Sequence, residues 1–251
     1  MSFITDKEFK SFIHKSTSNE LSILDQENPF YELIINVDYL FRQCLKTSKL
    51  DGNEVVKILI AQSHSYYLNA SRMVMSGAVP ESFMLSRGVL ESALYAFYIV
   101  NDFELGELWL TRSDNKKIFR EKFTIRKILD KLNCDNSELK AQVNEAYDSS
   151  IDFGAHPNGT AISSNIRISS TIRQKQIHFS YLSDDELNLA HCFQETIKNG
   201  ILALEILSQS DNIVVTTVNL KLELAKIKML FNKLSADLKP IASAHSANLK
   251  I

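Results

Sequence analysis

The chain has 251 residues, of which 45% are hydrophobic and 23% charged, and its formal net charge is −2. These values are ordinary for a folded globular protein, and the near-neutral charge gives no overall electrostatic reason to expect nucleic acid as a partner. Seven Gly and four Pro are few for this length. Because turns and sheets use these residues, their scarcity favours long helices over a strand-rich fold.

Helical spacing of apolar residues predicts four helices in the first 100 residues. Asn28 and Pro29 suit the cap and the first turn of the second helix, and Gly77 suits the end of the third. The polar stretch STSNELS separates the first helix from the second. The predicted ranges are 5–14, 29 to the turn at 51–53, 54–76 and 80–100.

The second half predicts more helices and one interruption. Residues 152–181 hold Gly, Pro and many Ser and Thr, with Ile alternating with polar residues, which predicts a loop and a small β-hairpin or extended lid. The predicted helices are 103–111, 115–132, 137–151, 186–208 and 213–238. We therefore expect an all-α, or mainly α, single domain over residues 1–251. It would be a multi-helix bundle of seven to nine helices with an extended or hairpin insertion near residues 160–181 and a disordered tail at 240–251.

Cysteine usage and the amino terminus indicate the compartment. The three cysteines, Cys44, Cys134 and Cys192, lie far apart and match no metal spacing, which suggests buried thiols in a reducing environment. The opening residues have acidic side chains and no apolar core of a signal peptide. The longest apolar run, 83–100, is short for a bilayer span. We expect a cytoplasmic protein without membrane contact.

The run FMLSRGVLESALYAFYIV at 83–100 is apolar nearly all the way round a helix, which is typical of the centre of a bundle. Arg87 and Glu91 lie four residues apart on one face and can bond to each other. Gly88, poorly suited to a helix interior, suggests that another backbone comes close there. The pair is either a buried structural ion pair or part of a ligand or catalytic site. In a dry core, Arg87→Ala would cost roughly 3–5 kcal/mol.

His156, in the stretch FGAHPNG, is the second candidate for a catalytic residue. A histidine on a shaped loop can serve as a general base or a metal ligand, since its pKa is near neutral. It can equally cap the carbonyls of the preceding helix. Tyr147, Asp148 and Asp152 lie just upstream and could orient it.

Metal and cofactor signals are weak. His64, His156 and His191 could converge with Glu91 on a metal, but no Glu-x-x-His or His-x-x-x-His pair supplies two ligands from one helix. We therefore expect His64 and His191 to be structural and no metal to be bound. The sequence contains no P-loop, GxGxxG, GxSxG or HExxH motif, and no cofactor is predicted.

Two amphipathic segments bear on partners. The basic segment 112–131 could lie on a phosphate backbone, although such a run is more often the solvated face of an amphipathic helix. Apolar residues from Leu220 to Leu238 follow a heptad spacing. That seam packs on its own bundle or pairs with a second copy, and we expect a homodimer.

With these residues in view, the stretch SRGVLESALYAFYIVND resembles the R-x-x-x-E central helix of a broad group of uncharacterised, mostly bacterial, all-helical proteins related to the HEPN-like superfamily. In that group a Trp helix, a Tyr helix and a His loop follow, which here correspond to Trp109, Tyr147 and His156. The similarity covers roughly residues 62–158. It implies a helical bundle of a kind found among abortive-infection, toxin–antitoxin and mobile-element genes.

Active HEPN ribonucleases carry an R-x4–6-H pattern that starts a helix and acts at an RNA phosphate. Here only Arg173 and His178 match the spacing, in surroundings that indicate a strand. Two hypotheses follow. The first is a non-catalytic or ligand-sensing bundle that acts through dimerisation or a protein partner, with a role in bacterial defence. The second is a HEPN-like RNA- or nucleotide-directed enzyme with His156 as base, Arg87 on phosphate and Glu91 orienting one of them.

Overall fold

The structure is a computed structural model, and it describes residues 7–25, 28–47, 50, 53–100, 102–132, 137–155, 166–170, 175–211, 213 and 220–248. Over these residues the chain forms ten α-helices, one π-helical turn and a two-stranded sheet. In chain order the elements are α1 (Lys7–Asp25), α2 (Pro29–Thr47), α3 (Glu54–Ser76), α4 (Val79–Ile99), α5 (Phe103–Leu110), α6 (Lys116–Lys122), α7 (Ile125–Leu129), α8 (Ser137–Ser150), η1 (Ile151–Ala155), β1 (Ile166–Ser170), β2 (Lys175–Phe179), α10 (Glu186–Leu207) and α11 (Leu220–Asn248). The predicted helical bundle is confirmed. β1 and β2 pair antiparallel, as expected for a hairpin insertion.

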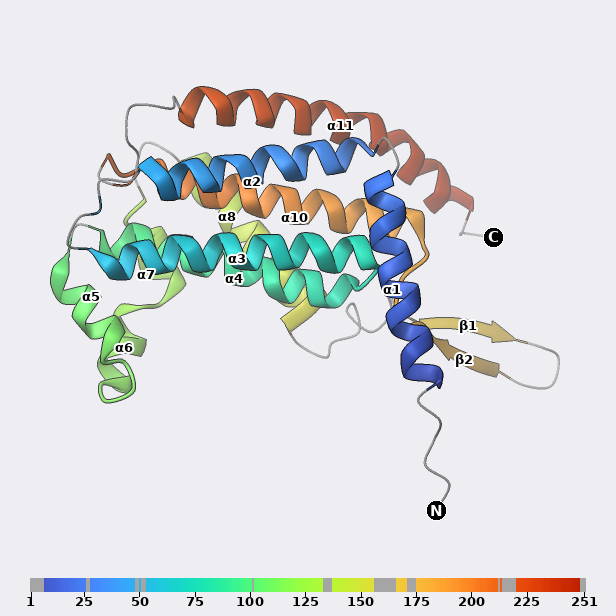
Figure 1. The fold of residues 1–251 in the computed structure, drawn as a ribbon, viewed down its shortest axis with the longest axis horizontal. Coiled ribbons are helices and arrows are strands. Elements are labelled where there is room, and N and C mark those ends of the chain that lie inside the picture. Colours follow the sequence, from blue (N-terminus) through green and yellow to red (C-terminus); the bar gives the residue numbers. More distant parts are fainter. Residues whose placement is uncertain are drawn as a thin grey trace, which may run out of the picture.

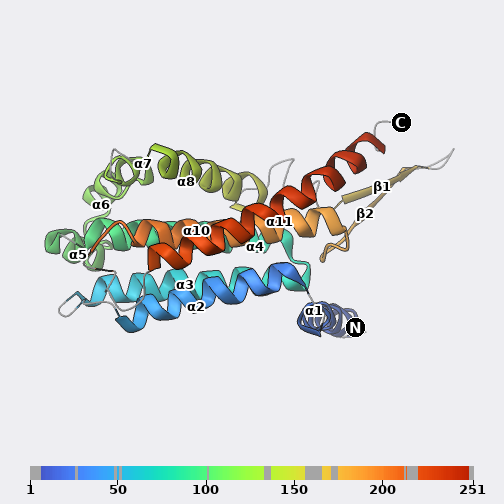
Figure 2. The ribbon, with the colours of Figure 1, turned by 90° about the horizontal axis from the view of Figure 1, so that it is seen from above.

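The long helices lie side by side in layers (Figures 1 and 2). In Figure 2, α2 and α3 form one side, α4 and α10 the middle, and α7 and α8 the other side. α11 packs on α10 and α2. α5 and α6 cap one end of the bundle, while α1 crosses the other end, where the hairpin projects (Figure 1). The arrangement places α4 at the centre, in contact with α3, α10, α8, η1, α7 and α5.

Helix boundaries follow from capping chemistry that the sequence displays. The side chains of Asn28, Asn53 and Asp185 each accept a hydrogen bond from a backbone N–H two or three residues later, at 2.9, 3.3 and 2.9 Å. Gly77 ends α3 in the left-handed region at φ 93°. A Cβ at that position would lie 2.8 Å from the carbonyl oxygen of Ser183, so both the conformation and the space require glycine.

Three helices differ from their predicted ranges. α1 continues through the polar stretch STSNELS instead of ending near His14, because it lies on the surface and none of its residues is buried. The basic segment forms two short helices, α6 and α7, and the break between them turns the ring of Phe123 into the core. α11 begins at Leu220 and its helical backbone continues to Asn248, where the sequence predicts a disordered tail.

Small polar side chains bring α3, α4 and α10 close together. The hydroxyl of Ser63 on α3 donates to the carbonyl of Val89 on α4 at 2.8 Å. The hydroxyl of Ser82 on α4 donates to the carbonyl of Ala70 on α3 at 2.9 Å and lies 2.9 Å from Oγ1 of Thr196 on α10. These bonds satisfy buried polar groups and fix three helices in register.

The cysteines that the structure describes are buried thiols, as predicted. Burial raises the pKa of Cys44 and of Cys192 to about 12, so both stay protonated and unreactive at neutral pH. Cys134 lies outside the described residues. In the described part of the chain, every helix is too short or too polar to cross a lipid bilayer.

Candidate functional site

Arg87 and Glu91 bond to each other on α4. The Nε of Arg87 donates to Oε1 of Glu91 at 2.9 Å, as their spacing predicts. The relative exposures of the two side chains are 32% and 30%. The pair therefore does not lie in a dry core, because α4 keeps one partly solvated strip on a helix that is otherwise largely buried.

Tyr147 on α8 completes a three-residue network. Its hydroxyl donates to the same Oε1 of Glu91 at 2.9 Å, and the guanidinium carbon of Arg87 lies 5.1 Å from its ring centroid. Burial, together with the charge of Glu91, raises the pKa of Tyr147 to about 12, so its hydroxyl remains a donor at neutral pH. Burial tends to lower the pKa of Arg87, but the bond to Glu91 and its charge outweigh this and raise it. We call these three residues the Arg87 network.

Gly88 accommodates an aromatic ring rather than the neighbouring backbone that the sequence suggests. A Cβ at Gly88 would lie 2.8 Å from Cδ2 of Tyr66 on α3. Gly88 lies between Arg87 and Glu91 in the sequence, and its lack of a side chain lets the Tyr66 ring pack directly on the backbone of α4.

A cavity of about 400 Å³ opens beside the network, between α3, α4, α5 and α6. Aromatic rings form much of its wall, from Tyr66, Tyr95, Trp109 and Phe119. Polar groups also reach it, from Gln62, Glu91, Ser92 and Arg112. We call it the aromatic cavity. The wall is thus a mixture of aromatic rings and polar groups, and small-molecule sites combine side chains of both kinds.

A second cavity of about 640 Å³ lies between α7 and α8, and Tyr147 is in its wall. Glu91 therefore lines one cavity and its hydrogen-bond partner Tyr147 lines the other. The Arg87 network is a polar connection between two hollows of the molecule.

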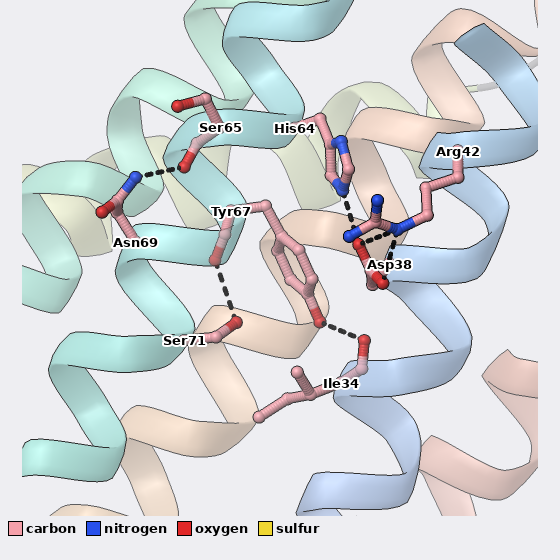
Figure 3. Close-up of polar contacts among 8 residues, drawn as sticks. All are labelled: Ile34, Asp38, Arg42, His64, Ser65, Tyr67, Asn69 and Ser71. Carbon is pink, nitrogen blue, oxygen red and sulfur yellow. Dashed lines mark hydrogen bonds and ion pairs between the residues drawn. The ribbon is translucent and has the colours of Figure 1, made fainter. Parts of the chain in front are cut away.

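A separate polar cluster joins α2 to α3 (Figure 3). The Nε2 of His64 lies 2.6 Å from Oδ1 of Asp38, and the Nε of Arg42 donates to Oδ2 of Asp38 at 2.9 Å. Burial tends to raise the pKa of Asp38, but hydrogen bonds from Arg42 and His64 outweigh it and hold the pKa below its usual range. The His64 ring stacks on Phe41 with centroids 5.3 Å apart. His64 is thus the hydrogen-bonded histidine that the sequence predicts.

The structure describes two of the other three histidines that the sequence singles out, His191 and His178. His191 is exposed on α10, with its ring 5.5 Å from that of Phe153. His156 and Arg173 lie outside the described residues. His178 lies on β2 opposite Arg167, in a strand as its surroundings indicate. Among the residues that the structure describes, no three His, Cys, Asp or Glu side chains gather as metal ligands.

The heptad residues of α11 face the bundle of their own chain. Leu220, Leu224 and Ile227 are buried, and Phe231, Leu234 and Leu238 pack partly buried against the core. The first of the two interpretations of this seam therefore holds for these side chains. Homodimer formation stays a prediction.

Comparison of the chain with protein-family models, curated proteins and solved structures finds no match. The resemblance to HEPN-like proteins accordingly stays a prediction, and the site must be interpreted from its own geometry.

Proposed function

We propose that this protein is a non-catalytic, ligand-sensing helical bundle, that the aromatic cavity binds its ligand, and that it acts through dimerisation or a protein partner. The observation that carries the proposal is the position of the Arg87 network. An ion pair with about a third of each side chain exposed contributes only about 0–1 kcal/mol to stability. Stability alone is therefore a weak reason for a polar network on the central helix.

The Arg87 network connects the ligand cavity to α8, a helix that packs on the outside of α4 and α10. Arg87 and Tyr147 both bond Oε1 of Glu91, so a ligand that donates a hydrogen bond to this oxygen from the aromatic cavity competes with them. Because Tyr147 belongs to α8, which packs on α4 and α10, occupancy of the cavity changes how α8 is held. If α8 has two packed positions, a ligand that binds one of them more tightly shifts the equilibrium toward that position. The family resemblance adds the proposal that the protein or second copy that responds belongs to a bacterial defence system.

The test is a thermal-shift screen of a small-molecule collection against the wild-type protein and a cavity-blocking variant. Gln62 is exposed on α3 and lines the cavity, so Gln62→Trp fills its mouth. Ala61→Trp is the matched control, since Ala61 is exposed on the same helix and outside that wall. We expect compounds that raise the melting temperature of the wild-type protein and of Ala61→Trp but leave Gln62→Trp unchanged.

Two results contradict the proposal. The first is a screen in which no compound stabilises the wild-type protein, or in which Gln62→Trp responds as strongly as the control. The second is turnover of RNA or a nucleotide by the purified protein that Arg87→Ala abolishes while the variant stays folded at the assay temperature, which identifies an enzyme instead.

A further inference from the structure

A hollow of about 470 Å³ adjoins the aromatic cavity at the surface of α5 and α6. Arg112 and Phe119 belong to both walls, so the two spaces are neighbours. Arg112, Lys116 and Arg120 supply its charge, and none of its lining residues is acidic. We call it the basic hollow.

We infer that the ligand is a small aromatic phosphate, whose planar ring lies in the aromatic cavity and whose phosphate lies in the basic hollow. This inference rests on the proposed function and specifies the chemistry of its ligand. It depends on the juxtaposition of a ring-lined space and a cation-lined space that share two residues.

The aromatic cavity suits a planar ring. Four aromatic side chains in one wall offer π faces and edges on which a planar ring can stack. Such stacking depends little on which polar atoms the ring carries. The amide of Gln62 and the hydroxyl of Ser92 lie in the same wall and can bond the ring's edge. The carboxylate of Glu91 also lines this space, where an N–H at the ring's edge can donate to it in competition with Arg87 and Tyr147.

The basic hollow suits a dianion. The guanidinium of Arg112 lies 4.4 Å from the Trp109 ring centroid, and its Nη1 donates to the carbonyl of Trp109 at 3.0 Å, so the group is oriented at the junction of the two spaces. Lys116 and Arg120 lie four residues apart on α6 and face one side of that helix. Like charges at this spacing repel each other, and a bound phosphate relieves the repulsion while accepting charge-assisted hydrogen bonds.

The dimensions and overall charge favour a small molecule over a polymer. Both spaces fall in the range of roughly 300–1,000 Å³ that is usual for small-molecule sites. The net charge of −2 gives no long-range attraction for a polyanion.

Trp109, the only tryptophan of the chain, lies in the wall of the aromatic cavity and reports its occupancy. We would titrate the wild-type protein with adenosine 5′-monophosphate and with phenyl phosphate while recording tryptophan fluorescence. Adenosine and inorganic phosphate are the controls that carry the ring or the anion alone. We expect a saturable change with at least one aromatic phosphate and binding roughly tenfold or more weaker for both controls. A response to adenosine 5′-monophosphate but not to phenyl phosphate identifies a nucleotide as the source of this chemistry.

Matched charge variants separate a specific site from general attraction. Lys116→Gln removes a cation of the basic hollow, whereas Lys117→Gln removes an exposed cation of the same helix that is outside both walls. Loss of one charge-assisted hydrogen bond predicts roughly tenfold weaker binding for Lys116→Gln and less than about a twofold change for Lys117→Gln. Arg112→Gln, followed by calorimetry, is expected to weaken binding at least as much as Lys116→Gln.

Equal weakening by the two lysine variants, or equal binding of adenosine and its monophosphate, overturns the inference. So does a lack of response to either aromatic phosphate. If the screen then yields other ligands that Gln62→Trp excludes, the inference has failed while the proposed function stands. If the screen yields none, both have failed.

Discussion

Replacement of Arg87 by alanine tests whether the Arg87 network is structural. A pair sealed in a dry core loses roughly 3–5 kcal/mol when one partner is removed. Here the side chains are 32% and 30% exposed, so the ion pair contributes about 0.2–1 kcal/mol. The contact of Arg87 with the Tyr147 ring adds about 0.5–1 kcal/mol at a site open to water. Alanine has a higher helix propensity than arginine, which offsets about 0.2 kcal/mol of the lost stability.

The expected decrease in the free energy of unfolding is therefore roughly 0.5–2 kcal/mol. At about 2–4 °C per kcal/mol for a chain of this size, the melting temperature falls by about 1–8 °C. The assay is urea denaturation followed by far-ultraviolet circular dichroism for wild type, Arg87→Ala, Glu91→Ala and the double variant, with unchanged slopes as the check on the unfolded state.

A loss above about 3 kcal/mol would refute the reasoning, because it would mean that the pair behaves as a buried one. A coupling energy indistinguishable from zero in the double-mutant cycle would show that the bond between Arg87 and Glu91 makes no measurable contribution to stability.

Three further predictions concern other residues. Gly200→Ala brings a Cβ within 2.5 Å of the fully buried Tyr67 ring, and we expect a net loss of roughly 1–3 kcal/mol in urea denaturation, because overpacking outweighs helix propensity; an equally stable variant contradicts this. The pKa of Tyr147 is raised to about 12, so its contribution to stability is complete below its unfolded pKa of about 10 and is lost as pH rises through 12; Tyr147→Phe should flatten that alkaline fall, and an unchanged profile would argue against the bond to Glu91. The pKa of Asp38 is lowered, so its contribution is present above an unfolded value of about 4 and is lost as pH falls below it; acid titration of Asp38→Asn should show a smaller loss than wild type, and an equal loss would show that Asp38 is not the group responsible.

Local chemistry made the helices predictable. Gly77 at the end of α3 and Asp185 at the start of α10 act through the chain within a few residues, so spacing alone places them. The bond between Arg87 and Glu91 is local in the same sense, since four residues make one helical turn.

The rest of the candidate site depends on tertiary packing. The sequence suggests that Tyr147 could orient His156, which lies outside the described residues, and gives no sign that Tyr147 bonds Glu91, 56 positions away along the chain. Nothing in the spacing indicates that Asp38 meets His64, because α2 and α3 must first pack for the two side chains to approach. The ring of Tyr66 against Gly88 is a further example: glycine signals a close approach but not what approaches.

α1 contributes no buried side chain among its described residues. Its bonds to α3 include the amide of Asn19 on the carbonyl of Ser76, at 2.8 Å, and the carboxylate of Glu20 on Arg72, at 3.2 Å. Ile23 packs partly buried against the core, so the packed face of α1 is small, and a helix of 19 residues with little packing is only marginally stable in water. Its amides should therefore exchange with solvent through local opening, at a much lower free energy than those of α3, α4 and α10. The protein thus has a hierarchy of stability, with a centre that opens only on global unfolding and an outer helix that can leave while the centre stays folded.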